Sequence, residues 1–129
     1  DLHFPLRRQR QMCIRDRSNA VQRMVEDAGF SVIRDFVGHG VGKSLHEEPQ
    51  IPNFGRPGTG PKLREGVVLC IEPMVNMGRR AVKMSDDGWT ALSADGSESA
   101  HFEHTILVTD GEPEILTCPD NLPSRPEAS

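Results

Sequence analysis

Apolar side chains recur at helical spacing over residues 18–30, the clearest periodic signal in the chain. From Val21 to Ala28 they occupy positions i, i+3, i+4 and i+7, which share one stripe of an α-helix. Ser18, or the asparagine that follows it, can cap the start of this helix, and Gly29 is placed to end it. The pattern therefore predicts one amphipathic helix in this segment.

Short apolar runs bounded by turn residues follow the helix and predict strands. Residues 49–61 are rich in proline and glycine, so we expect a loop there. The predicted strands cover residues 30–37, 67–71, 101–109 and 114–117, with an extension over 74–77 and a hairpin around 89–92.

One helix, many strands and long loops together indicate an α+β fold, with an antiparallel sheet flanked by the helix. The length of 129 residues corresponds to about one domain. We expect this domain to cover residues 18–117, between a segment without regular structure, 1–17, and a flexible tail, 118–129. Residues 9–17 also resemble translated sequencing-adapter read-through, which suggests that the first segment is an artefact.

Charge and cysteine content narrow the classes of protein that the chain can represent. The net charge is −4, although residues 1–17 carry +3, so the rest of the chain is acidic. An acidic body argues against nucleic-acid binding, and no apolar run approaches the roughly 18 residues of a membrane span. The cysteines Cys13, Cys70 and Cys118 lack zinc-pair spacing and accompany no secretory signal, so we expect a reducing, cytoplasmic setting. Cys70, inside an apolar run, is expected to be a small core residue.

The string GHGVGKS at residues 38–44 resembles a phosphate-binding loop but is one residue too short. Such a loop has four residues between its first glycine and the Gly-Lys-Ser, and here only three separate Gly38 from Gly42. Because the loop wraps phosphate with consecutive backbone N–H groups, the missing residue matters. We therefore do not expect nucleotide binding.

Three residues of metal-ligand type occur in or directly after predicted strands. His39 lies between two glycines, Glu72 ends a buried strand, and Glu103 lies within a strand between two histidines. Carboxylates with an imidazole suit a divalent metal held by rigid strands. A salt bridge to an arginine, or a strand end open to water, would explain Glu72 without a metal. A polar outer face, which alternation shares with His101 and Thr105, would explain Glu103.

Two further side chains have a structural interpretation, and one of them also has a functional one. His46 either lies on the surface or donates a hydrogen bond to a substrate carbonyl. Trp89, the only tryptophan, would by itself be explained by packing in the core or against the hairpin. The residues alone leave both alternatives for His46 open.

Five short strings then occur in order at consistent spacing, and together they are specific. They are GHGVG at residues 38–42, LHEEP at 45–49, IEPM at 71–74, DGWT at 87–90 and FEHT at 102–105. This order resembles the C-terminal half of type I methionine aminopeptidases, which have the pita-bread fold. The resemblance covers about residues 18–117, and the 33-residue interval from His39 to Glu72 has no room for the helical insertion of type II enzymes.

The resemblance implies a two-metal hydrolase, with cobalt, manganese, iron or zinc as the divalent ions. It implies that His39 binds one metal, that Glu72 binds the same metal and transfers a proton from the nucleophilic water, and that Glu103 bridges both. His46 would contact the substrate carbonyl and support the tetrahedral intermediate. His46 and Glu72 are thus the implied catalytic residues.

The resemblance also implies a substrate and a setting. The substrate would be the N-terminal methionine of nascent peptides, its side chain held in a pocket lined by Trp89 and by Leu45, where many members have phenylalanine. A cytoplasmic monomer acting near the ribosome is expected, with no direct nucleic-acid partner and no membrane.

The sequence departs from the family pattern at one point. Two metal-binding aspartates and a further histidine near the substrate amine have no matching motif here, since Asp16, Asp27, Asp35 and His3 lie elsewhere. We therefore predict that the isolated chain binds metal weakly and does not hydrolyse peptides. A proline-specific peptidase of the same fold and a non-catalytic peptide-binding module are the alternatives. The strings HEEPQ at residues 46–50 and EPMVN at residues 72–76 favour the methionine enzyme.

Overall fold

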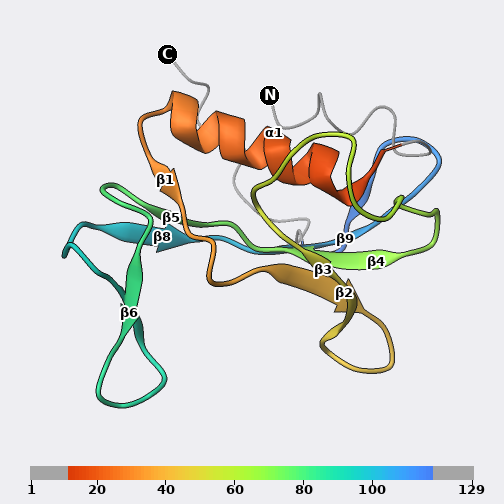
Figure 1. Cartoon of the computed structure of the whole chain (residues 1–129). Helices are drawn as coiled ribbons and strands as arrows, with labels where there is room; N and C mark the ends of the chain where they lie inside the picture. The colour runs from red at the N-terminus through yellow and green to blue at the C-terminus, as the bar shows by residue number, and fades with distance from the viewer. Residues whose placement is uncertain (1–11, 118–129) are drawn as a thin grey trace.

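A computed structural model describes residues 12–117, and one helix covers a face of its antiparallel strands (Figure 1). The predicted α+β class with a flanking helix is confirmed. Within residues 12–117, the single helix has 14 residues and falls short of the length and apolarity of a membrane span. The predicted tail, 118–129, lies outside the described residues.

Helix α1 covers Ile14–Asp27 and begins four residues earlier than its periodicity predicts. The backbone N–H of Cys13 donates to the Asp16 carboxylate over 2.8 Å, which supports the first turn. Ser18 does not cap the helix; it is buried and its hydroxyl donates to the Ile14 carbonyl at 3.1 Å. The expectation of no regular structure over residues 1–17 is therefore wrong for residues 14–17.

Burial explains why the helix extends beyond the predicted stripe. Ile14 is 2% exposed and packs into a core with residues from distant strands and loops. Such tertiary burial stabilises a helix more than local periodicity does. The core consists of Ile14, Ile51, Leu63, Leu69, Ile106 and Val108.

The larger sheet has five antiparallel strands in the order β10-β9-β4-β2-β3. Strand β3 runs through Pro49, so the predicted loop over residues 49–61 begins too early. Proline is tolerated there because β3 is an edge strand, where a missing N–H leaves no ladder partner unpaired. The strands are β2 (Gly38–Val41), β3 (Glu47–Ile51), β4 (Val68–Ile71), β9 (His104–Leu107) and β10 (Glu114–Ile115).

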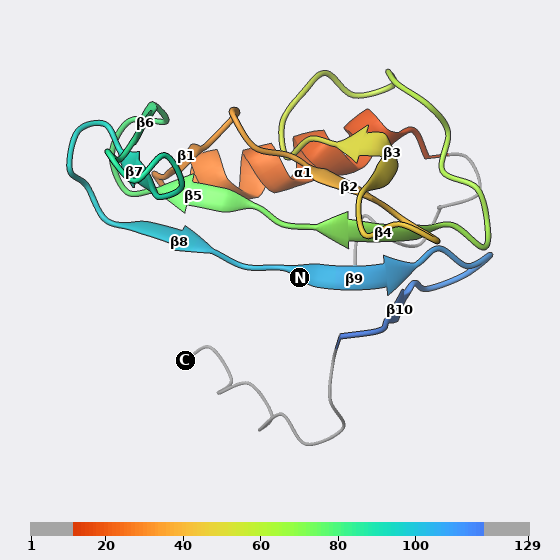
Figure 2. The ribbon, with the colours of Figure 1, turned by 90° about the horizontal axis from the view of Figure 1, so that it is seen from below.

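A smaller sheet, β1-β5-β8, continues from the larger one, and a hairpin, β6-β7, projects from its end (Figures 1 and 2). The predicted strand over residues 30–37 is only two residues long, because the chain bends between β1 and β2. These strands are β1 (Ser31–Val32), β5 (Met74–Asn76), β6 (Val82–Met84), β7 (Ala91–Ser93) and β8 (Ser99–His101).

Two connections carry the chain from one sheet to the other at neighbouring positions. Strand β4 leads into β5 through residues 72–73, and β8 leads into β9 through residues 102–103 (Figure 2). The backbone N–H of Phe102 donates to the Pro73 carbonyl at 3.3 Å, which ties the two junctions together. The predicted continuous strand over 101–109 is therefore wrong: it is broken at Phe102 and Glu103, where the chain changes sheet.

Candidate metal centre

Strand register brings the metal-type residues to one face of the larger sheet. His39 on β2 pairs with Cys70 on β4, and Cys70 pairs with Thr105 on β9. Directly opposed residues share a face of the sheet, and so do residues two apart along one strand. Glu72 and Glu103 therefore extend the same face from β4 and β9, each at a junction between the two sheets.

The side chains converge at contact distance. His39 Nε2 lies 3.4 Å from one Glu72 carboxylate oxygen, and His101 Nε2 lies 3.6 Å from the other. The other ring nitrogen of His39, Nδ1, donates to the Gly40 carbonyl at 2.9 Å, since a carbonyl can only accept. That hydrogen bond orients the ring with Nε2 directed toward Glu72, the arrangement that metal-binding histidines adopt.

Two overlapping sets of three ligand atoms fit a divalent cation. His39, Cys70 and Glu103 form one set, and Glu72, His101 and Glu103 form the other, with ligand atoms in each set within 4.8 Å of one another. Carboxylate and imidazole donors suit manganese, iron, cobalt or zinc. Glu103 belongs to both sets, as a bridging carboxylate would.

The electrostatics of the site also favour a cation. Burial raises the pKa of the Glu72 carboxyl, and the nearby charge of Glu103 raises it further, while His39, His101 and His46 act in the opposite direction. Burial is also the largest cause that raises the pKa of the Cys70 thiol. A cation between the carboxylates would relieve their repulsion.

The raised pKa of Glu72 predicts a pH-dependent effect of Glu72→Gln on the metal-free chain. A folded-state pKa above the ordinary 4.5 means that ionised Glu72 destabilises the fold. This destabilisation by ionised Glu72 is fully present at pH values above the folded-state pKa. It disappears as the pH falls through that pKa toward the pKa of Glu72 in the unfolded chain. Urea denaturation with a chelator should therefore show Glu72→Gln to be more stable than wild type at neutral pH, with the gain shrinking toward pH 4. Glu65→Gln, at an exposed position, is the control, and a less stable Glu72→Gln at neutral pH would contradict the prediction.

The other predicted site residues lie around this cluster. The ring of His46, in the loop between β2 and β3, lies 4.0 Å from the ring of His39, so it borders the cluster. Leu45 precedes it and is 70% exposed. Trp89 lies in the turn of the β6-β7 hairpin and is 87% exposed, so it does not pack in the core.

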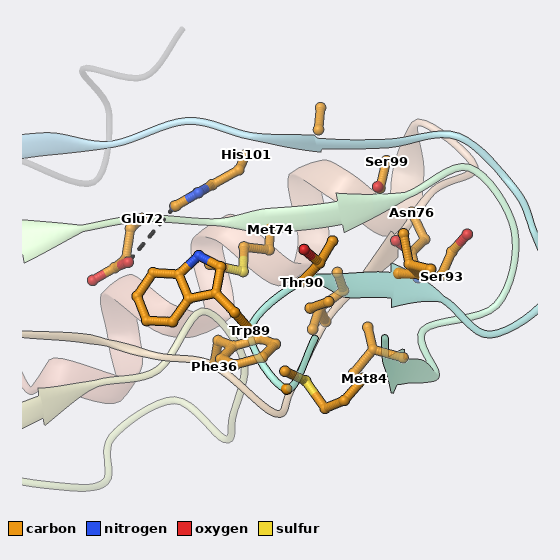
Figure 3. Close-up of a pocket in the computed structure, with 16 residues that line it drawn as sticks. Phe36, Glu72, Met74, Asn76, Met84, Trp89, Thr90, Ser93, Ser99 and His101 are labelled. Atoms are coloured by element: carbon orange, nitrogen blue, oxygen red, sulfur yellow. Dashed lines mark ion pairs between the residues drawn. The ribbon is translucent and has the colours of Figure 1, made fainter. Parts of the chain in front are cut away.

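A hollow of about 820 Å³ adjoins the cluster, between the smaller sheet and the hairpin. Figure 3 shows Glu72 and His101 at one end of the hollow, beside the Trp89 ring. Phe36 and Met74 add apolar lining, and Leu45 is not among the lining residues. The hollow can therefore accept an apolar side chain next to the carboxylates.

Sequence reasoning did not assign His101 or Cys70 to the site. Alternation of side chains along the strand already placed His101 on the same face as Glu103, but a polar outer face was a sufficient explanation for both residues. Cys70 lies two residues before Glu72, which places the two on one face of β4, but its apolar neighbours favoured a core role. The expected burial of Cys70 is confirmed at 3% exposure.

Residues 7–110 match metallopeptidase family M24. The chain is 62% identical over 102 residues to a methionine aminopeptidase of Clostridium perfringens, which covers 79% of this chain and 41% of that protein. It is 56% identical over 100 residues to methionine aminopeptidase 1 of Bacillus subtilis, covering 78% of this chain and 40% of that protein. The chain thus spans about two fifths of the length of these relatives.

Solved structures of metallopeptidases also superimpose on this chain. A methionine aminopeptidase of Thermotoga maritima superimposes with a TM-score of 0.83 at 57% identity, covering 84% of this chain and 44% of that one. A prolidase of Pyrococcus horikoshii OT3 superimposes with a TM-score of 0.61 at 21% identity, covering 88% of this chain and 27% of that one. The prolidase shares the fold alone.

Proposed function

The chain belongs to metallopeptidase family M24, and from this membership we propose that it is part of an enzyme that hydrolytically removes N-terminal methionine. The predicted resemblance to methionine aminopeptidases and the predicted pita-bread fold are confirmed by the relatives and solved structures. The observation that carries the proposal is the convergence of His39, Glu72 and Glu103 beside an apolar hollow.

In the proposed reaction, His39, Glu72 and Glu103 hold the divalent metal. When bound, the metal supplies Lewis acidity and lowers the pKa of a coordinated water. Glu72 accepts the proton of the attacking water on a carboxylate oxygen and delivers it to the amine that leaves. Its carboxylate is partly buried and lines the hollow, where it can hold that proton transiently.

The remaining residues orient the substrate. His46, beside His39, donates a ring N–H to the oxygen of the scissile carbonyl and stabilises the negative charge that develops there. Trp89, Phe36 and Met74 surround the methionine side chain in the hollow. Leu45, which is exposed in the loop before β3, contacts the substrate at the edge of this site.

We further propose two metal ions, drawn from cobalt, manganese, iron and zinc, because Glu103 is common to two ligand sets. The substrates are nascent peptides near the ribosome, in the cytoplasm, and the enzyme acts as a monomer, as the resemblance implies. Residues 18–117 form the partial catalytic domain of this proposal, although α1 crosses its first boundary.

Identity favours the methionine enzyme over a proline-specific peptidase of the same fold. The methionine aminopeptidases of Clostridium perfringens and Bacillus subtilis are 62% and 56% identical to this chain, whereas the superimposable prolidases are about 20% identical. Retention of His39, Glu72 and Glu103 argues against a non-catalytic module. The chain alone should still fail to hydrolyse peptides, because the family's two aspartates have no counterpart in its sequence.

A chimera tests the proposed function. The 102 matched residues of the Clostridium perfringens protein are replaced by those of this chain, and methionine release from Met-Ala-Ser is measured with added metal. We expect turnover by the chimera, none by its Glu72→Gln variant, and none by the 129-residue chain alone. Cleavage of an Xaa-Pro dipeptide instead, or peptide binding without turnover, would contradict the proposal.

A further inference from the structure

We propose that Asp87 is a positioning residue, which holds the Trp89 ring at one end of the hollow and so sets the affinity for the methionine side chain. The inference rests on the proposed function, which it deepens by assigning a role to a residue outside both the ligand cluster and the lining of the hollow. Both residues lie in the turn of the β6-β7 hairpin, over residues 85–90.

Packing does not hold the Trp89 ring in place. The residue is 87% exposed, and it lies at the tip of a hairpin whose two strands form a separate two-stranded sheet. Its ring nevertheless lies beside Glu72 and His101, at one end of the hollow (Figure 3). The position of the ring must therefore be set mainly by the backbone that carries it.

Asp87 fixes that backbone through three hydrogen bonds. One oxygen of its carboxylate accepts from the backbone N–H groups of Trp89, at 2.9 Å, and of Thr90, at 2.8 Å. The other oxygen accepts from the Thr90 hydroxyl at 2.5 Å. Hydrogen bonds to an ionised carboxylate are stronger than those between neutral groups. They hold the pKa of the Asp87 carboxyl below its usual value, the Thr90 hydroxyl contributing most, so the acceptor stays charged at neutral pH.

Other hydrogen bonds close the turn itself. The backbone N–H of Ser85 donates to the Thr90 carbonyl at 2.8 Å, and that of Gly88 donates to the Ser85 carbonyl at 3.0 Å. Gly88 has a φ of +68°, in the left-handed region that favours glycine, so the chain can reverse directly before Trp89. Without the Asp87 carboxylate the turn would stay closed, whereas the peptide units of residues 89 and 90 would gain freedom and the ring would leave its place beside the hollow.

The first test follows the order of the ring in the full 129-residue chain. Trp89 is the only tryptophan and the chain has no tyrosine, so tryptophan fluorescence reports on this one side chain. Time-resolved anisotropy should show local rotation of the ring that is faster by about twofold or more in Asp87→Ala than in the wild type. Asp87→Asn keeps an oxygen acceptor for both N–H groups and should stay close to the wild type. The matched control is Asp86→Ala, which removes a neighbouring exposed charge from the same turn and should leave the anisotropy unchanged.

The second test measures methionine release from Met-Ala-Ser by the chimera. Asp87→Ala should raise KM by about fivefold or more and leave kcat within about twofold, because it weakens binding of the methionine side chain and leaves the metal centre intact. Asp87→Asn should restore most of the lost affinity, and Asp86→Ala should match the parent chimera.

The two tests separate the role of Asp87 from the proposed function. Unchanged anisotropy in Asp87→Ala, or a fall in kcat with KM unchanged, would overturn the role of Asp87 and leave the proposed function standing. No turnover by any form of the chimera would overturn the proposed function, and the role of Asp87 toward the substrate with it. Thr90→Val removes one of the three hydrogen bonds and should speed rotation of the ring by less than Asp87→Ala, so the anisotropy test stays decisive if Asp87→Ala fails to fold.

Discussion

Replacing Glu103 by glutamine is expected to weaken divalent-metal binding by the 129-residue chain by about 100-fold or more. Glu103 is the one residue common to both ligand sets among the residues described, so its loss leaves each set with two members. An amide has nearly the same shape as a carboxylate, but it is neutral and a poor metal ligand. Calorimetric titration with cobalt or zinc measures the change, and the same substitution in the chimera should abolish methionine release.

The control is Glu98→Gln, an exposed glutamate five residues earlier in the chain. It should leave metal affinity within about twofold of the wild type, because it lies outside both ligand sets. If Glu103→Gln binds metal as tightly as the wild type, the cation is held elsewhere. The bridging role proposed for Glu103 would then be withdrawn.

Replacing Gly38 by alanine is expected to destabilise the chain by about 3 kcal/mol or more and to impair metal binding as well. Strand β2 lies between β3 and β4, and a Cβ at this position would clash with the Cys70 carbonyl on one side. On the other side it would lie 3.2 Å from the Ile51 carbonyl oxygen. Both obstacles are backbone atoms, so no side-chain rotation can relieve them, and His39, the next residue, would be displaced.

Urea denaturation with and without metal measures both effects of Gly38→Ala. Gly111→Ala is the matched control, because a Cβ there meets no atom within 4 Å, and its stability should change by no more than about 0.5 kcal/mol. Equal stabilities for the two variants would mean that the glycine before His39 is not required by the packing of β2. The same argument applies to Gly40, where the added Cβ would meet the Glu48 carbonyl.

The local patterns in the sequence singled out the candidate ligand residues, but they did not give the bounds of the strands that carry these residues. Strand register makes His39, Glu72 and Glu103 adjacent in the structure, whereas the sequence singles out Glu72 because it terminates an apolar run, where a charged group needs a partner. The break at Phe102 and Glu103 was not predictable from β-propensity, because both halves of residues 101–109 favour strands and only the arrangement of sheets separates them.

Long-range contacts account for most of the remaining differences. Helix α1 begins at Ile14 because that side chain is buried in the core cluster that contains Leu63 and Leu69, which helical periodicity does not reveal. Strand β3 passes through Pro49 because its position at an edge is a property of the sheet. His101 joined the site for a similar reason, since only the pairing of β8 with β5 places it opposite Met74 and close to Glu72.

The paired junctions between the sheets have a mechanical consequence. Glu72 and Glu103 each stand where the chain passes from the larger sheet to the smaller one, and the hydrogen bond from Phe102 to Pro73 joins these crossing points. A cation held by both carboxylates, as proposed above, would also join the two sheets at these crossing points. Because Glu72 lines the hollow as well, a side chain bound in the hollow would contact a carboxylate of the metal centre, which would couple occupancy of the hollow to metal binding.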